Sequence, residues 1–261
     1  MTESQLTVLA VGATGSIGQH VIDEATRQGH TVRALVRDPG KLRAQPGVDV
    51  VVGDLTRPQS LLAAVEGVDA IVFTHGTYGC AREVEAVDYG GVRNVLAAIR
   101  DKRRRLALMT AIGVTDRKGA HDWKRRAERL VRASGHPYTI VRPGWFDYND
   151  PDQLRLVLLQ GDTRQSGTPR DGVVARRQIA QVLVRSLTSD VALRKTFELV
   201  AERGPESDDF DPLFASVDAD ESGALDALHD SANMPLDQDP QQVLKDLDDV
   251  MAQRHLTGTG L

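Results

Sequence analysis

The stretch Leu6–Gly18, which reads LTVLAVGATGSIG, decides the fold of this chain. Its first half is an almost unbroken apolar run, as in a parallel strand that is buried on both faces. Its second half places glycines at positions 12, 15 and 18, and a helical pattern follows over about 17–28. Glycines in this place let backbone amides and a helix N-terminus approach an anion, because no side chain stands in the way. Strand, glycine turn and helix together predict a dinucleotide-binding unit.

The same alternation continues outward from this unit to about residue 145. Strands are predicted over 31–36, 48–52, 70–73, 106–109 and 138–141, and helices over 58–65, 83–100 and 122–134. A further strand over 154–159, a helix over 177–187 and a strand over 196–200 follow. Strands that alternate with such helices form parallel, doubly wound sheets. We expect one α/β domain of the Rossmann type over residues 1–203, with a small substrate region at about 145–180.

The segment 204–261 differs from this domain in charge. Residues 204–250 hold 14 Asp and Glu against one Lys, in a chain with 32 Lys and Arg and 37 Asp and Glu. Residues 204–234 show no period and are expected to be loop or partly disordered. Apolar residues from Leu236 to Met251 recur at helical spacing and predict an amphipathic helix. This charge asymmetry has three interpretations: the segment lies over the basic body, it is a disordered arm, or the body binds a polyanion. In function, the segment is interpreted as a lid over the substrate pocket, an arm for dimerisation or a disordered tail.

Composition excludes several classes of protein. Hydrophobic residues make up 41% and charged residues 26%, which is ordinary for a globular chain, and no apolar run is long enough to span a membrane. The first residues lack the basic region of a signal peptide, and the single Cys80 fits a reducing cytoplasm. No His or Cys spacing predicts a metal site, and Lys102–Arg105 are interpreted as solvated cations at a helix end. We expect a cytoplasmic protein with a small-molecule ligand, no nucleic-acid or membrane partner, and an open oligomeric state.

The residues after the second strand indicate which dinucleotide binds. An NAD site needs a carboxylate there for the ribose 2′-hydroxyl. In this chain Arg37 takes the first place after the strand, and Lys41 lies nearby. A 2′-phosphate pairs well with a guanidinium group. The pattern favours NADPH, and Asp38 keeps NADH possible.

Motifs along the chain resemble the short-chain dehydrogenase/reductase superfamily, and within it the atypical branch of NmrA-like and epimerase-like proteins. The resemblance covers about residues 6–200. It rests on GATGSIG at 12–18, ALVRDPGKL at 34–42, GDL at 53–55, VDYGGVRNVLAA at 87–98 and WKRRAERLVRASGHPYTIVRPGWF at 123–146.

This resemblance implies a set of cofactor contacts. They are Gly12, Thr14, Gly15, Ser16 and Ile17 in the turn, Arg37 and Lys41 after the second strand, Asp54 and Leu55 at the adenine, Thr74, His75 and Gly76 after the fourth strand, Lys124 at the nicotinamide ribose and Pro143 beside the nicotinamide.

The catalytic pattern of the family is incomplete in this chain. Active relatives carry a tyrosine four residues before the lysine, but here Ala120 stands four residues before Lys124. The serine that belongs after the fifth strand is replaced by Thr110, which offers a hydroxyl, and Ala111, which offers none. Thr110 and Lys124 are the expected catalytic residues. A general acid raises the reaction rate by about 10²–10⁴-fold, so we expect another group to donate the proton that the missing tyrosine would supply.

Candidates for the missing proton donor are Tyr78, Tyr89, Tyr148 and His75, whereas Tyr138 is expected in the core. The substrate's own hydroxyl is another, because a ligand held in place can assist its own reaction. Tyr78, Trp145, Phe146 and Tyr148 cluster near the expected nicotinamide end and suit a flat aromatic substrate, although ordinary packing explains them equally well.

We expect NADPH-dependent reduction of a ketone on a bulky aromatic or polycyclic substrate. The missing tyrosine is similar to that of the angucyclinone ketoreductases of polyketide tailoring, of the simocyclinone type. Two alternatives stay open: a non-catalytic NADP(H) sensor of the NmrA type, and an epimerase or quinone reductase on the same fold.

Overall fold

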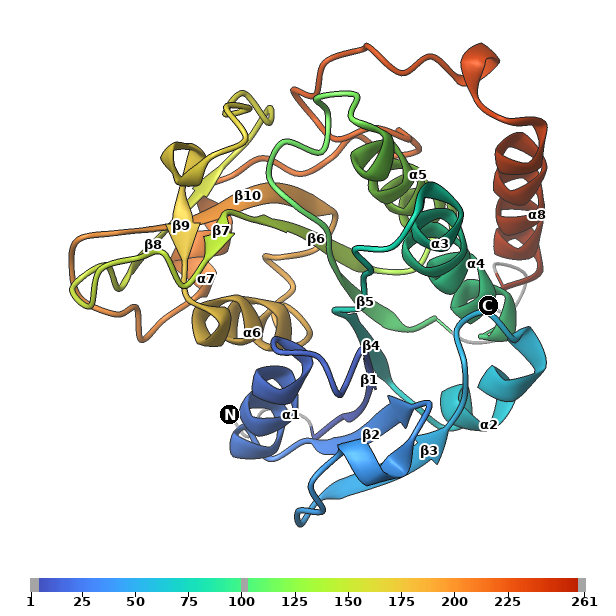
Figure 1. The fold of residues 1–261 in the computed structure, drawn as a ribbon, viewed down its shortest axis with the longest axis horizontal. Helices are drawn as coiled ribbons and strands as arrows, with labels where there is room; N and C mark the ends of the chain where they lie inside the picture. Colours follow the sequence, from blue (N-terminus) through green and yellow to red (C-terminus); the bar gives the residue numbers. More distant parts are fainter. Residues whose placement is uncertain (1–4, 100–102, 258–261) are drawn as a thin grey trace.

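The computed structural model describes residues 5–99 and 103–257. The strands of its central sheet are β1 Thr7–Val11, β2 Thr31–Val36, β3 Val48–Val52, β4 Ala70–Phe73, β5 Arg105–Met109, β6 Tyr138–Pro143, β8 Arg155–Leu159 and β10 Lys195–Glu202. They lie in the order β3-β2-β1-β4-β5-β6-β10-β8 (Figure 1). Only β8 is antiparallel to its neighbour, β10. The predicted doubly wound parallel sheet is therefore confirmed.

Helices cover both faces of this sheet. One face is covered by α1 Gly18–Arg27, α6 Arg176–Arg185 and α7 Asp211–Ala215, which share one hydrophobic core. The other is covered by α2 Leu62–Val65, α4 Gly90–Ala98, α5 Gly119–Ala133 and α8 Gln241–Thr257, which share a second core. Strand side chains alternate between the two cores, and burial of each large one contributes about 1.5–3 kcal/mol. This burial on both faces explains the unbroken apolar runs of the strands.

Two predicted helices differ from their expected form. The stretch 58–65 is a 3₁₀ turn, Pro58–Leu61, followed by the single turn of α2. The stretch 83–100 comprises α3 Ala81–Val84, a π-helical turn Glu85–Tyr89 and α4, and residue 100 lies outside the described residues. The π-helical turn places Asp88 beside the loop after β4, where its carboxylate accepts a hydrogen bond from the amide of Thr77. Sequence periodicity cannot resolve this single-turn change of helix type.

The predicted substrate region contains a small second sheet. Its strands β7 Trp145–Phe146 and β9 Val173–Val174 pair in parallel, and the 3₁₀ turn Pro169–Asp171 precedes β9. A Cβ on Gly144 would lie only 2.5 Å from the carbonyl oxygen of Gly172, so the close approach of these two segments requires glycine. The contact fixes the direction in which β7 leaves the end of β6.

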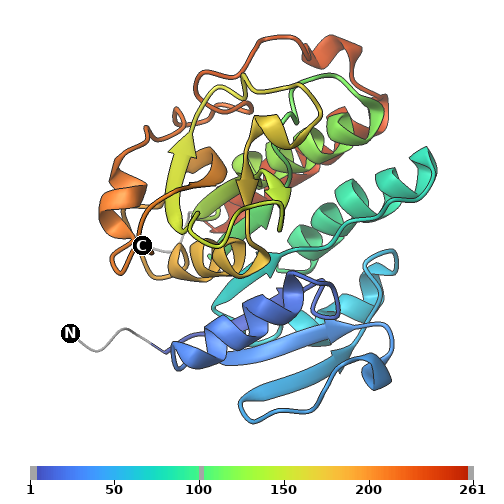
Figure 2. The ribbon, with the colours of Figure 1, turned by 60° about the vertical axis from the view of Figure 1, so that its left-hand side comes forward.

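The acidic C-terminal segment is well packed as far as residue 253. Figure 2 shows the later, dark orange to red part of this segment beside the green helices, on the side of the molecule away from the blue strands, whereas α7 belongs to the core on the other face of the sheet. Phe214 is fully buried, and Lys195 donates to the carbonyl oxygens of Phe214 and Val217 at 2.6 Å each. Residues 204–234 form loop around the short helix α7, in keeping with the first of the two expectations, and apolar side chains and buried ion pairs anchor this loop.

The segment neutralises a row of arginines on α5. Arg125, Arg129 and Arg132 are buried on that helix and form ion pairs with acidic residues of the segment. These partners are Asp220, Asp226 and Asp239, and Asp230 pairs likewise with Arg142 of β6. Of the three interpretations of the charge asymmetry, the one in which the segment lies over the basic body describes this arrangement.

The described residues also settle two smaller points. Arg105 belongs to β5 and donates to the carbonyl oxygen of Ser189 at 2.7 Å, whereas Lys102 lies outside the described part of the chain. No helix within residues 5–99 and 103–257 is long and apolar enough to cross a membrane.

Candidate functional site: a dinucleotide cavity and an aromatic pocket

A cavity of about 350 Å³ lies at the carboxyl ends of β1, β2, β3 and β4. The strand order reverses beside β1, and ligands of open α/β sheets bind at such a crevice. Predicted cofactor contacts on its wall are Gly12, Thr14, Gly15, Arg37, Asp54, Leu55, Thr74, His75 and Gly76, and the wall also includes Gly53, Thr56, Thr77, Glu83 and Val87.

The glycine turn requires glycine for steric reasons. Gly12 has a φ of +89°, and a Cβ there would lie 2.7 Å from the backbone nitrogen of His75. Gly18 has no room either, because its Cβ would lie 2.0 Å from the carbonyl oxygen of Gly12. Ser16 and Ile17 are not on the cavity wall: the Ser16 hydroxyl accepts from Arg176 at 3.0 Å, and Ile17 is buried in the core. The turn offers its backbone to the ligand.

Charged groups after β2 favour a phosphate over a ribose hydroxyl. Arg37 is exposed on the cavity wall. The Asp38 carboxylate is engaged by the amide of Gly40 at 3.0 Å, where it caps a 3₁₀ turn. Lys41 ends this turn and does not line the cavity, which differs from the sequence expectation. Arg37 is therefore the one Lys or Arg on the cavity wall among the described residues.

The predicted adenine end is held by hydrogen bonds of its own. The Asp54 carboxylate accepts from the amide of Thr56 at 2.9 Å and from its hydroxyl at 2.8 Å. The hydrogen bond from the Thr56 amide holds the pKa of Asp54 below its usual value, although partial burial opposes it. Asn94 of α4 donates to the carbonyl oxygen of Leu55 at 2.7 Å. These contacts fix the GDL turn before any ligand binds.

His75 is half-buried between the end of β4 and α4, with both of its ring nitrogens shielded from solvent. A Cβ on Gly91 would lie 3.0 Å from its Nε2, so this glycine makes room for the imidazole. Burial lowers the pKa of His75 to about 4, which leaves the ring neutral at physiological pH. A neutral buried ring that packs against a helix is a poor proton donor, so His75 is better described as part of the cavity wall.

Lys124 and Thr110 are both engaged with carboxylates. Lys124 of α5 forms an ion pair with the buried Asp88 beside Gly76, near the cavity but not on the wall of either pocket. The Thr110 hydroxyl is buried and donates to Glu128 at 2.7 Å. The expectation that Thr110 donates to a substrate is therefore not supported, because its proton is committed to Glu128. The neighbouring Ala111 faces the second pocket.

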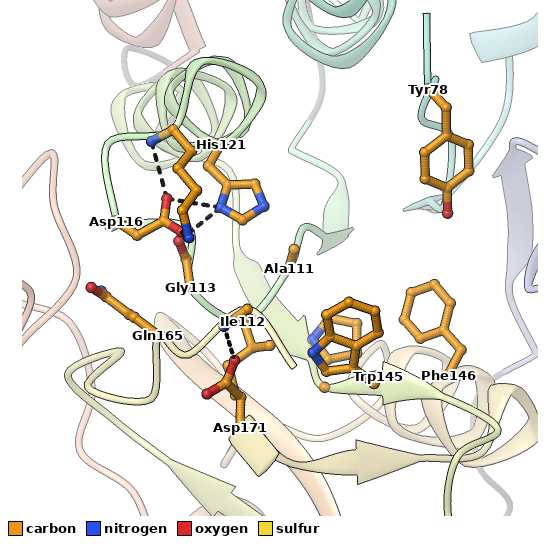
Figure 3. Close-up of a pocket in the computed structure, with 14 residues that line it drawn as sticks. Tyr78, Ala111, Ile112, Gly113, Asp116, His121, Trp145, Phe146, Gln165 and Asp171 are labelled. Atoms are coloured by element: carbon orange, nitrogen blue, oxygen red, sulfur yellow. Dashed lines mark hydrogen bonds and ion pairs between the residues drawn. The ribbon is translucent and has the colours of Figure 1, made fainter. Parts of the chain in front are cut away.

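A second pocket of about 210 Å³ lies beyond the ends of β5 and β6. Its aromatic and apolar wall consists of Tyr78, Ala111, Ile112, Pro143, Trp145 and Phe146. Its polar residues are Asp116, Lys118, His121, Gln165 and Asp171 (Figure 3). Thr77 lines the dinucleotide cavity and the adjacent Tyr78 lines this pocket, so the loop after β4 separates the two spaces.

The four tyrosines have different surroundings. Tyr78 lines the pocket but is fully exposed at its mouth, and Tyr148 stacks edge-on against Trp145 outside the lining. Tyr89 donates to Asp246 of α8 at 2.8 Å, which with burial raises its pKa strongly. Tyr138 donates to Asp220 at 3.0 Å in the core, as expected. Among the tyrosines, only Tyr78 lines the pocket.

Sequence reasoning missed His121, Asp116 and Gln165. His121 lies one residue after Ala120, the position inspected for the absent tyrosine, and it occupies the first turn of α5. Gln165 enters the pocket from the polar loop before β9 and donates to the hydroxyl of Thr115 at 2.7 Å. In the sequence, these residues are indicated only by a histidine three residues before Lys124, and this spacing matches none of the catalytic motifs described above.

The described part of the C-terminal segment, residues 204–257, does not line this site. Among the described residues, none after Asp171 lines either of the two cavities. Helix α8 instead packs against α4 and α5, and Figure 1 shows it beside these helices, away from β7 and β9. The interpretation of the segment as a lid is therefore not supported for the described residues.

The first cavity fits a dinucleotide. Side chains at Gly12 and Gly18 would clash with nearby backbone, so the turn leaves its backbone amides open to a phosphate, and the cation Arg37 lies on the cavity wall. Fold and site thus define a Rossmann-type dinucleotide-binding protein. The family model described as NAD(P)H-binding matches residues 12–190, so the chain belongs to the NAD(P)H-binding family. The expected cofactor class is confirmed.

Similar proteins span most of the chain. An uncharacterised chloroplastic protein of Arabidopsis thaliana is 28% identical over 83% of this chain and 77% of its own length. Sanguinarine reductase of Eschscholzia californica is 25% identical over 83% of this chain and 97% of its own length. The oxidoreductase ylbE of Lactococcus lactis has a TM-score of 0.67 at 17% identity, over 81% of this chain and 96% of its own. These similarities indicate that the chain is like the NAD(P)H-dependent oxidoreductases. The cytoplasmic location stays a prediction.

Proposed function

We propose that this protein reduces a ketone on a flat aromatic or polycyclic substrate with NADPH. The observation that carries the proposal is the pocket beside the dinucleotide cavity, whose wall includes Trp145 and Phe146. Large apolar surfaces with a few polar groups are typical of sites for aromatic ligands. A relative that is itself a reductase supports the reaction class. Tyr78 is exposed at the mouth, so rings longer than the pocket would extend into solvent there.

The chain's residues have defined roles in this proposal. The glycine turn and Arg37 hold the cofactor phosphates, and the GDL turn holds the adenine. Pro143, the last residue of β6, and Gly144 line the pocket, where they would flank the nicotinamide beside the substrate. The bound cofactor supplies the hydride, so the protein itself must position the ketone and provide a proton.

The test is a titration of the purified protein with NADPH and NADH by cofactor fluorescence, followed by cofactor oxidation with 1-tetralone, polycyclic aromatic ketones and quinones. We expect tighter binding of NADPH and ketone-dependent oxidation. Oxidation with quinones alone would replace the proposal by a quinone reductase. Failure to bind either nucleotide would overturn it entirely.

One observation favours a second candidate, a sensor that binds NADP(H) without consuming it. Ala120 removes the phenol of active relatives, and Lys124 is paired with Asp88. A sensor keeps the cofactor cavity and needs no proton donor. Tight NADPH binding without turnover of any ketone or quinone would support this candidate and contradict the reductase.

A further inference from the structure

The aromatic pocket contains a histidine whose two ring nitrogens have different surroundings. The Nδ1 atom of His121 lies 2.8 Å from the carbonyl oxygen of Gly113 and 3.1 Å from a carboxylate oxygen of Asp116. A carbonyl oxygen only accepts hydrogen bonds, so Nδ1 carries its proton in both charge states of the ring. Nε2 is therefore the atom that gains or loses a proton. Figure 3 shows the ring with this second nitrogen turned towards the pocket, away from Asp116.

Asp116 is built to stay ionised behind this ring. Its side chain is 7% exposed, accepts from the amide of Lys118 at 3.0 Å and pairs with the ammonium of Lys118 at 2.6 Å. Burial alone would raise the pKa of Asp116, but these bonds and His121 outweigh it and hold the pKa below its usual value. A fixed carboxylate at Nδ1 orients an imidazole and stabilises its cationic form, as in other carboxylate–histidine pairs. Asp116 is thus a positioning residue.

His121 also lies where a proton donor is needed. It is the residue next to Ala120, the position of the absent phenol, and it shares its pocket with Pro143 and Trp145. Its side chain is 28% exposed, so a ligand can reach it. The other candidates are less suited: Tyr89 is bonded to Asp246, and His75 is neutral inside the fold.

We propose that His121 is the general acid that protonates the carbonyl oxygen of the ketone, in place of the tyrosine that the chain lacks. This rests on the proposed reductase function. The bound cofactor supplies a hydride to the carbonyl carbon. As the carbon–oxygen π bond breaks, its electron pair moves to the oxygen, which takes the proton from Nε2. The alcohol forms, the ring is left neutral, and water returns a proton to it.

The first measurement does not depend on turnover. The imidazole proton resonance of His121, assigned by its loss in His121→Gln, is followed by NMR as 1-tetralone is added without cofactor. We expect this resonance to shift, and to shift less in Asp116→Asn. A His121 resonance that stays unchanged up to saturating 1-tetralone overturns the proposal, whether or not the protein proves to be a reductase.

The second measurement is the rate of ketone reduction. His121→Gln should lower kcat by about 10²–10⁴-fold, the usual contribution of a general acid, while the dissociation constant for NADPH stays unchanged. His229→Gln, which changes an exposed histidine outside the pocket, is the matched control and should keep the rate. Tyr78→Phe, which keeps the ring in the pocket wall and removes only its hydroxyl, should lower kcat less than His121→Gln does. Loss of the rate in Tyr78→Phe and not in His121→Gln assigns the proton to the tyrosine and overturns the proposal. Retained rate in both variants favours donation by a hydroxyl of the substrate and overturns it too.

The pH profile separates a chemical role from a structural one. The reduction rate should fall as pH rises, because His121 must be protonated, and this fall should disappear in His121→Gln. The charged or titratable groups around the same pocket are Asp116, Lys118, Asp171 and Tyr78, and Lys124 one turn along is paired with Asp88. If the fall in rate persists in His121→Gln, it is caused by one of these other groups, and the proposal is overturned.

The proposed function fails in a different way. If the unaltered protein does not bind NADPH, the reductase function is contradicted, whereas a failure of the role given to His121 leaves NADPH binding intact.

Discussion

The dinucleotide cavity and the acidic segment on α5 both depend on charge, but they use it in opposite ways. The cavity is open, its phosphate turn is built from backbone, and its main cation, Arg37, is exposed. The segment is closed, and arginines such as Arg129 are buried against carboxylates roughly a hundred residues away. An open site keeps its charge for a ligand. A buried network uses its charge internally, and the removal of one partner leaves another charge uncompensated.

The largest expected effect is on the buried network. Arg129→Ala removes the partner of Asp226 at 2.7 Å and of Asp239 at 2.9 Å. Each carboxylate would keep only one arginine partner, Arg125 for Asp226 and Arg126 for Asp239, so we expect the free energy of unfolding to fall by up to about 3–5 kcal/mol. Urea unfolding measures this. NADPH affinity, measured well below the transition, should change little.

The control for this experiment is Arg203→Ala, which removes a pair with Asp150 on the surface, where the arginine side chain is 74% exposed. Exposed pairs contribute about 0–1 kcal/mol. An equal loss of stability in the two variants would contradict the distinction between open and buried charge.

Arg37→Ala tests the open charge. Hydrogen bonds to a charged group contribute about 1.5–3 kcal/mol, so the dissociation constant for NADPH should rise by roughly 10–100-fold. That for NADH should stay nearly constant, because NADH has no 2′-phosphate. Arg43→Ala, an exposed cation that is not on the cavity wall, serves as the control. Parallel weakening of both nucleotides would contradict the role given to Arg37.

Gly12→Ala tests the backbone of the turn. The added methyl group would lie 2.7 Å from the backbone nitrogen of His75, and the turn must shift. Overpacking of this kind costs about 1–3 kcal/mol, and we expect weaker binding of both nucleotides by fluorescence titration. Gly29→Ala is the matched control, because its φ is also positive, at +84°, but nothing lies within 4 Å of its Cβ. It should lower stability slightly and leave binding intact.

A pH-dependent effect on stability is expected for Glu198, a buried carboxyl of β10. Burial raises its pKa to about 8, against the opposing charge of Arg142. The folded state therefore holds a proton that the unfolded state loses near pH 4.5, so this group's contribution to stability falls as pH rises from about 4.5 to 8. Glu198→Gln cannot ionise and should flatten this part of the stability profile in urea unfolding. A profile of unchanged slope would show that Glu198 is ionised in the fold.

Glu128 has the opposite sign and provides the internal comparison. Burial opposes its ionisation, but Arg142 and Arg132 outweigh burial and lower its pKa to about 2. Its contribution to stability is present above the unfolded value of 4.5 and is lost as pH falls towards 2. Two buried carboxyls of one network thus titrate on opposite sides of their ordinary value, because Glu128 has two close arginines and Glu198 has one.

The part of the site that could be predicted from sequence is the part made by consecutive residues. Gly12, Gly15 and Arg37 belong to short motifs at strand ends, and parallel strands bring such ends together at one edge of the sheet. Trp145 and Phe146 were predicted in the same way, from their place after β6. Lys41 and Tyr148 were misplaced, because the direction of a side chain in a loop is not encoded by distance along the chain.

The sequence by itself determined the order of strands and helices, the glycine turn and the class of ligand, because apolar periodicity and steric need act over a few residues. Only the tertiary structure decided that α5 is covered by the acidic segment, that Thr110 is bound to Glu128, and that His121 faces the aromatic pocket with Asp116 behind it. Each of these is a pairing of side chains on different segments. Such pairings follow from the packing of the elements in space, which no local pattern specifies.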